Sequence, residues 1–153
     1  MTATLEEAAR ELLEVVPIVM RDIRSEMRSR RSPDLTVPQF RTLAFVYGNE
    51  GSSLLDVANH MGLTPPSTCR LVDGLIIRDM MTRQDNPADR RRVKLAATLR
   101  GITILKASRQ STMVYLADRL RDVSAEDREV IVKAMEALRS VFTTGQQLRA
   151  VAK

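Results

Sequence analysis

Apolar residues recur every three or four positions over most of the chain, which is the spacing of amphipathic helices. The longest of these stretches predict helices over residues 4–30, 98–120 and 124–142. Pro17 lies inside the first stretch, where it is expected to kink the helix or to shift its start, because proline lacks an N–H. Long amphipathic helices are therefore expected near both ends of this sequence.

Three shorter helices are predicted between them, and each has a hydroxyl side chain at its N-cap position. These N-caps are Thr36, Ser53 and Thr64. Gln39 follows the first N-cap by three residues and completes a capping box. Gly62 permits a tight turn before the third helix, which runs to about residue 78. A short helix, a glycine turn and a well-capped second helix indicate a helix-turn-helix.

Two short strands are predicted after the helix-turn-helix, over residues 80–84 and 93–97. Residues 85–92 between them are rich in turn-forming and charged side chains. This pattern is typical of a β-hairpin, here with a long basic tip. A helix-turn-helix followed directly by such a hairpin is a winged helix. The predicted fold class is mainly α with a small β-hairpin.

The net charge of +5 gathers near the hairpin. Residues 70–100 carry eight basic and four acidic side chains, and seven of the eight are arginines. The planar guanidinium binds phosphates and guanine edges better than an ammonium does. Aromatic residues make up only 3% of the chain, which argues against a surface that stacks on sugars or on unpaired bases. Double-stranded DNA is the partner that this charge pattern favours.

The segment at the hairpin resembles the wing signature of the MarR family of transcriptional regulators. The residues that carry the resemblance are Asp89, Arg90, Arg91, Leu95, Ala97, Thr98 and Gly101. Two positions depart from the signature, because Leu95 and Ala97 stand where Val and Leu are usual. The resemblance covers nearly the whole chain. It implies an N-terminal dimerisation helix over residues 1–35, a DNA-binding winged helix-turn-helix over 36–98 and C-terminal dimerisation helices over 99–153, all in one continuous folding unit.

The recognition helix and the wing are the candidate DNA-binding segments. The expected contacts are Pro65, Pro66, Ser67, Thr68 and Arg70 on the helix, and Asp89, Arg90 and Arg91 on the wing. The N-terminus of the recognition helix is also expected to favour a phosphate. Simple capping is the alternative role for Thr64 and Ser67, and a solvated surface is the alternative for Arg70. By resemblance, Arg91 enters the minor groove, Asp89 braces it, and Arg90 meets phosphates.

Other chemistry finds little support in the sequence. The only histidine is His60 and the only cysteine is Cys69, so neither a catalytic constellation nor a metal site is expected, and no cofactor. Some relatives sense oxidants through a cysteine in the first helix, but this chain has none there. One cysteine and no long apolar run favour a cytoplasmic protein without a membrane partner.

The sequence thus predicts a homodimeric, sequence-specific regulator that binds an operator in double-stranded DNA. The resemblance implies a repressor that is released by a small aromatic or phenolic ligand, whose binding residues the sequence leaves unknown. Two alternatives stay open: a non-specific architectural DNA-binding protein, and a protein-interaction adaptor built on a winged helix.

Overall fold

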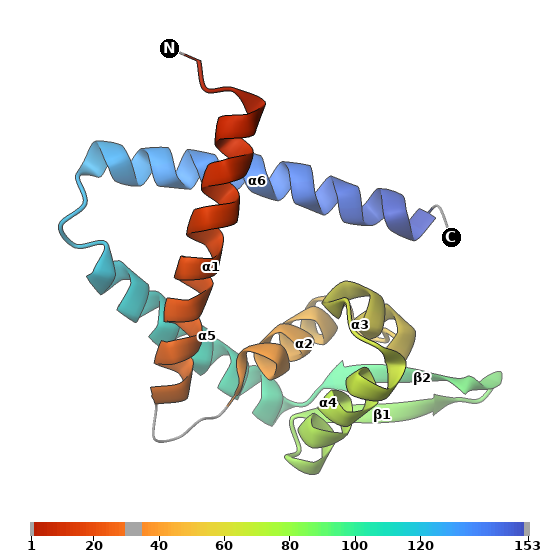
Figure 1. Cartoon of the computed structure of the whole chain (residues 1–153). Coiled ribbons are helices and arrows are strands. Elements are labelled where there is room, and N and C mark those ends of the chain that lie inside the picture. Colours follow the sequence, from red (N-terminus) through yellow and green to blue (C-terminus); the bar gives the residue numbers. More distant parts are fainter. Residues whose placement is uncertain (1, 30–34, 152–153) are drawn as a thin grey trace. The chain divides into compact units, whose positions relative to one another are not determined.

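The computed structural model contains six helices and one antiparallel hairpin in the part of the chain that it describes, residues 2–29 and 35–151 (Figure 1). Only the backbone is described for residues 90, 91 and 144–151. The elements are α1 (Leu5–Ser29), α2 (Val37–Gly48), α3 (Leu54–Met61), α4 (Pro65–Ile77), β1 (Met81–Asn86), β2 (Asp89–Ala97), α5 (Leu99–Arg119) and α6 (Ala125–Val151). The predicted fold class, a mainly helical winged helix-turn-helix, is confirmed. Pro17 lies within α1 without shifting its predicted start.

Hydroxyl caps start the short helices as the sequence predicts. Thr36 Oγ1 accepts a hydrogen bond from the N–H of Gln39, whose side chain accepts one from the Thr36 N–H in return. Ser53 forms the same reciprocal capping box with Asp56. Gly62 ends α3 with a φ of 66°, in the left-handed region where glycine is favoured. These local hydrogen bonds and turns define helix ends through residues that are close in the sequence.

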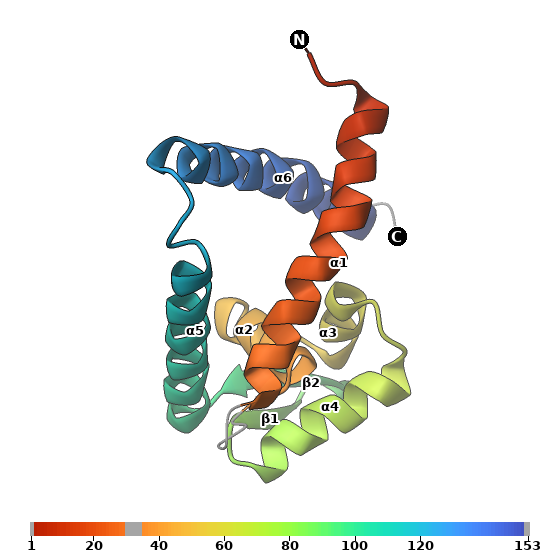
Figure 2. The same ribbon diagram turned by 60° about the vertical axis from the view of Figure 1, so that its left-hand side comes forward.

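The core of the winged lobe joins the three short helices, the hairpin and the start of α5. Its fully buried side chains include Leu43, Val46, Val57, Val72, Leu75, Met80, Met81 and Leu95, with Leu105 from α5 beside them. The three short helices gather around the base of the hairpin (Figures 1 and 2). Tyr47 of α2 is 45% exposed, because its neighbour Val46 occupies the core position.

The hairpin differs from the expectation at its tip. Strands β1 and β2 are longer than predicted, and only Pro87 and Ala88 form the turn, so the expected long tip is wrong. Asn86 pairs with Asp89, but the neighbouring Asp85 pairs with Val93. Residues 90–92 therefore lie in a bulge of β2, which alters the register and bends the strand. The arginine run occupies this bulge.

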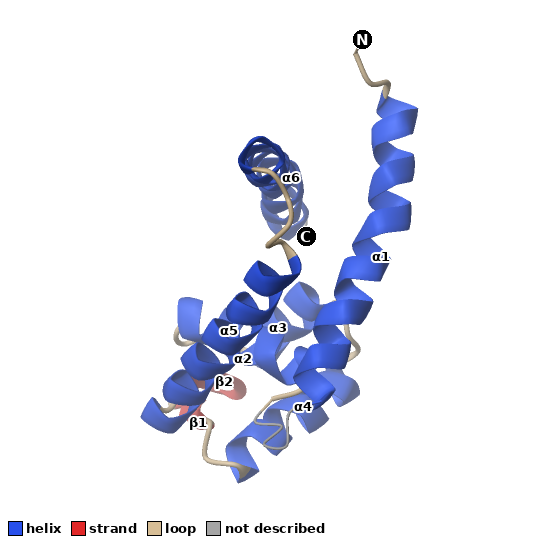
Figure 3. Ribbon diagram, turned by 90° about the vertical axis from the view of Figure 1, so that its left-hand side faces the viewer, coloured by secondary structure: helices blue, strands red, loops and turns tan. Residues whose placement is uncertain are grey.

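A further backbone segment joins the sheet on the other edge of β2. The N–H of Leu95 donates to the carbonyl of Ser52, and the N–H of Gly51 donates to the carbonyl of Leu95. Gly51 has a φ of 84°, which favours glycine at this position. The segment between α2 and α3 thereby anchors the base of the wing to the helices (Figure 3 colours the strands red).

Residue contacts divide the chain into two units, Met1–Met113 and Val114–Lys153. Exposed apolar side chains are frequent on α1 in the first unit and on α6 in the second. Within the described residues, none of the helices is both long and apolar enough to cross a bilayer. The division into dimerisation and DNA-binding segments remains a prediction.

Candidate nucleic-acid interface

Helix α4 presents one polar and one buried face. Its buried residues are Thr68, Val72 and Leu75, which face the core. Pro65, Pro66, Ser67 and Arg70, all expected to contact DNA, are exposed. Thr68 is not: its side chain is fully buried and its hydroxyl donates to the Thr64 carbonyl over 2.9 Å. Burial removes Thr68 from the residues that can reach a base edge, so we withdraw it from the expected contacts.

The first turn of α4 offers few backbone donors. Pro65 and Pro66 have no N–H, and the N–H of Ser67 donates to Thr64 Oγ1 over 3.4 Å. The N–H of Thr68 donates to the Thr64 carbonyl. Anion binding at a helix start needs free N–H groups that point at the ligand. The N-terminus of α4 therefore lacks the free N–H donors that the expected phosphate would need. Thr64 acts as a cap.

An ion pair joins the recognition helix to the wing. Arg83 Nη1 of β1 lies 3.9 Å from Asp73 Oδ1 of α4, and both side chains are about half exposed. Asp73 is not among the predicted contact residues, because its partner is on another element. An exposed ion pair of this kind contributes little to the stability of the fold. Its effect is to link the side chains of α4 and β1. Asp73 of α4 thus has a cation of the wing as its partner.

The acidic residue of the wing signature lies at the start of β2. Asp89 Oδ2 is 3.9 Å from Arg92 Nε, and both side chains are well exposed. Asn86 Oδ1 accepts a hydrogen bond from the Ala88 N–H over 3.0 Å, which closes the turn. Arg90 and Arg91 belong to β2, but their side chains lie outside the described residues. Their expected roles at the DNA therefore stay predictions.

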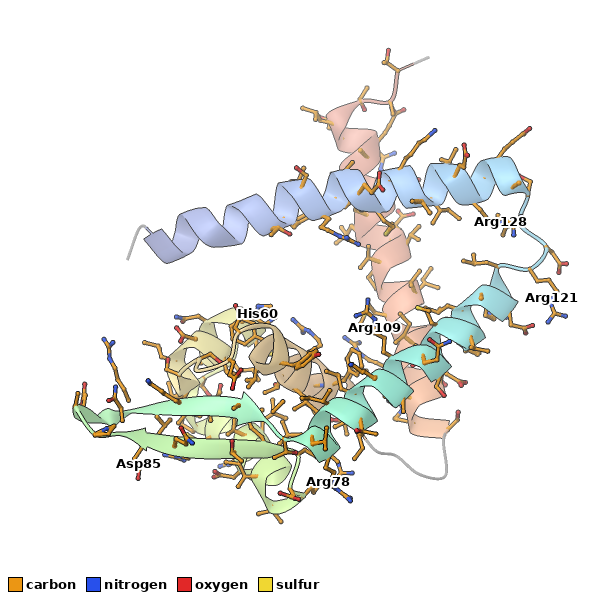
Figure 4. All side chains as sticks on the ribbon, turned by 180° about the vertical axis from the view of Figure 1, so that it is seen from behind. His60, Arg78, Asp85, Arg109, Arg121 and Arg128 are labelled. Carbon is orange, nitrogen blue, oxygen red and sulfur yellow. The ribbon has the colours of Figure 1, made fainter. Side chains whose placement is uncertain are left out.

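The base of the wing is tied to α4 and α5. Asp79 adopts a φ of 56° directly after α4, and its carbonyl accepts a hydrogen bond from Thr98 Oγ1 over 2.6 Å. Thr98 Oγ1 also accepts from the Gly101 N–H at the start of α5. In Figure 4, Arg78 lies at this base of the hairpin and Asp85 lies toward its tip. Arg78 Nη1 further donates to Gln39 Oε1 of α2 over 3.4 Å, which fixes the end of α4.

The single histidine and the single cysteine do not form a chemical site. The His60 ring stacks on Phe45 with 4.3 Å between centroids. Burial lowers the pKa of His60 below 6.5, and the charge of Arg41 lowers it further. Cys69 is half-buried on α4. Across the described ranges, three or more histidine, cysteine or acidic side chains nowhere gather as metal ligands would.

Comparison with known proteins shows similarity to DNA-binding regulators. The sequence model of the MarR family matches residues 34–92, a range that includes α2, α3, α4, β1 and the first part of β2. An uncharacterised HTH-type transcriptional regulator of Mycobacterium leprae is 26% identical over 136 residues, covering 88% of this chain and 94% of the relative.

Solved structures share the arrangement over most of the chain. A crystal structure of MarR matches with a TM-score of 0.79 at 21% identity and covers 87% of this chain and 98% of its own. Streptococcus pneumoniae FabT, solved in complex with DNA, matches with a TM-score of 0.68 at 16% identity and covers 92% and 99%. The chain is thus similar to the MarR family of winged helix-turn-helix transcriptional regulators, in sequence over residues 34–92 and in fold over most of its length.

Proposed function

We propose that this protein is a homodimeric repressor that binds a specific operator in double-stranded DNA. The observation that carries the proposal is the exposed face of α4, which presents Pro66, Ser67 and Arg70 beside a basic hairpin. The major groove admits one α-helix and presents a distinct pattern of groups for each base pair. Helix α4 is the element that reads this groove, because its opposite face is fixed in the core.

The wing supplies the second contact. Arg91 enters the minor groove, where a narrow groove concentrates negative potential, and Arg90 meets a phosphate. Asp89 braces Arg91, and its carboxylate also lies 3.9 Å from Arg92 of the same bulge. Each protomer therefore reads DNA in two ways: α4 contacts base edges, and the wing recognises the width of the minor groove.

Dimerisation doubles the contact with DNA. Ile131, Met135 and Phe142 lie four and seven residues apart on α6, and 38%, 50% and 63% of their surfaces are exposed. Val16 and Val19 of α1 are also nearly half exposed. Single exposed apolar residues are ordinary, but repeated ones along a helix face are typical of an interface. A two-fold dimer places two recognition helices at half-sites about one helical turn apart.

Release by a small ligand is the regulatory part of the proposal. An aromatic or phenolic anion fits the family resemblance. Lys106 Nζ of α5 lies 5.9 Å from the ring centroid of Tyr47 on α2, so a cation and a half-exposed ring lie together there. A thermal-shift screen of phenolic and aromatic carboxylates, followed by DNA titration with each hit, tests this step. Hits that leave DNA affinity unchanged would remove ligand release from the account.

Genomic recovery of bound fragments, followed by gel-shift titration, tests the DNA-binding function. We expect a few enriched fragments that bind far more tightly than scrambled duplexes of the same length. Tight binding to every duplex alike would favour the architectural alternative. Binding to none, with a protein partner recovered instead, would favour the adaptor.

A further inference from the structure

The outward face of α4 carries a short, unusual set of side chains. Pro66, Arg70, Asp73 and Ile77 follow the i, i+4, i+7, i+11 spacing of one helix face. All four are exposed, and they lie opposite the buried Thr68, Val72 and Leu75. A base edge that faces the middle of this helix can therefore contact these four positions.

Hydrogen-bond donors are scarce at the N-terminal end of this face. The Pro66 ring offers only C–H groups, and the chain lacks an N–H at positions 65 and 66. Thr64 Oγ1, which accepts from the Ser67 N–H, also donates to Ser67 Oγ over 3.1 Å, so the Thr64 O–H is engaged and the Ser67 O–H is the side-chain donor left next to Pro66. The surface that remains at Pro66 is apolar. In the major groove, thymine is the base that presents an apolar group, its 5-methyl.

Arg70, one turn further along α4, can hydrogen-bond to a different base. Among the side chains that the structure describes, it has neither an ion pair nor a hydrogen-bond partner, because its acidic neighbour Asp73 faces Arg83 of the wing. A free guanidinium matches the O6 and N7 acceptors of guanine with two hydrogen bonds. Four residues of helix rise about 6 Å, which is about two base-pair steps of 3.4 Å.

We propose that Pro66 selects a thymine in each operator half-site through its methyl group, and that Arg70 selects a guanine about two base pairs away. The inference rests on the proposed function and adds to it the base identities that the protein reads. The proline, which removes a donor from the helix, is thereby a specificity-determining residue and not only a helix starter.

The test separates the methyl contact from DNA binding in general. The full-length protein first selects sites from a library of random-sequence duplexes. Each thymine of the selected site is then replaced by deoxyuracil, which pairs identically but lacks the methyl, and affinity is measured by gel shift. At one thymine per half-site, near a guanine, we expect about fourfold weaker binding per lost methyl and about fifteenfold for both half-sites.

Two proline variants provide the matched comparison. Pro66→Ala and Pro38→Ala both remove an exposed proline from the second position of a helix, in α4 and α2 respectively. We expect Pro66→Ala, whose shorter side chain keeps less apolar surface, to lower the preference for thymine over uracil, whereas Pro38→Ala keeps the wild-type ratio. Arg70→Ala should lose the preference for guanine and keep the preference for thymine.

Failure of the inference and failure of the proposed function give different results. A selected site that tolerates uracil at every thymine within twofold would overturn the thymine contact while leaving sequence-specific binding intact. A wild-type ratio in Pro66→Ala, or its loss in Pro38→Ala as well, would also overturn it. Absence of any selected site would overturn the proposed function and this inference together. The uracil scan uses the unaltered protein, so it decides even if a variant does not fold.

Discussion

Gly101 is the position where a single methyl group should cost the most. A Cβ built on Gly101 would clash with the carbonyl oxygen of Met80 and would lie 2.9 Å from its carbonyl carbon. That carbonyl cannot easily move, because it accepts the N–H of Thr98 over 3.1 Å at the junction of β2 and α5. Gly101→Ala must therefore displace backbone and break or stretch this hydrogen bond.

The magnitude follows from two contributions. Overpacking in a tight site costs typically 1–3 kcal/mol, and a lost hydrogen bond adds about 1 kcal/mol. We expect the free energy of unfolding to fall by about 3 kcal/mol, which lowers the melting temperature by about 6–12 °C in a protein of this size. Thermal unfolding followed by circular dichroism, at equal protein concentrations, measures the change.

Gly74→Ala is the matched control within the same winged lobe. A Cβ at Gly74 approaches nothing closer than the Gln39 side-chain nitrogen, at 4.0 Å. Alanine in place of glycine inside a helix stabilises it by up to about 1 kcal/mol, so its melting temperature should rise by about 2–4 °C. Equal melting temperatures for Gly101→Ala and wild type would refute the reasoning, because the Met80 carbonyl would then have to move freely.

Three further predictions concern the wing, the assembly and pH. Arg91→Ala should weaken operator binding at least tenfold in a gel shift without changing the melting temperature; unchanged affinity would contradict the wing contact. Light scattering at micromolar concentration should give about twice the 17.2 kDa chain mass, and a stable monomer would reject the dimer. Because burial first, and then Arg41, lower the pKa of folded His60, the unfolded chain binds a proton more readily. The free energy of unfolding should therefore fall as pH drops from 7 through 6.5 toward the pKa of folded His60. Denaturant titrations should show a shallower fall in His60→Gln, and an equal fall in both proteins would contradict this.

The helices of this chain were predictable because their signals are local in the sequence. Features that depend on contacts between distant residues could not be predicted in the same way. Thr36, Ser53 and Thr64 cap helices through partners three residues away, so the printed sequence contains both partners. The wing register is different, because the bulge at residues 90–92 depends on pairing between two strands. A turn-rich, charged segment looks the same in sequence whether it is a long loop or a bulged strand.

The candidate site shows the same division. Thr68 stands four residues before Val72 and seven before Leu75, so helical spacing already held the signal for its burial. The contact between Asp73 and Arg83 joins α4 to β1, and the charges alone could not identify which residues pair. Gly101 belonged to the predicted motif. The group that excludes a side chain at this position, the Met80 carbonyl, lies 21 residues away in the chain.

The ratio of specific to non-specific DNA affinity tests the central claim most directly. The full-length protein is titrated with its selected operator and with a scrambled duplex of equal length, at several salt concentrations. The account predicts at least about a thousandfold preference for the operator, and affinity for both duplexes that falls steeply as salt rises. Equal affinity for the two duplexes at every salt concentration would contradict it.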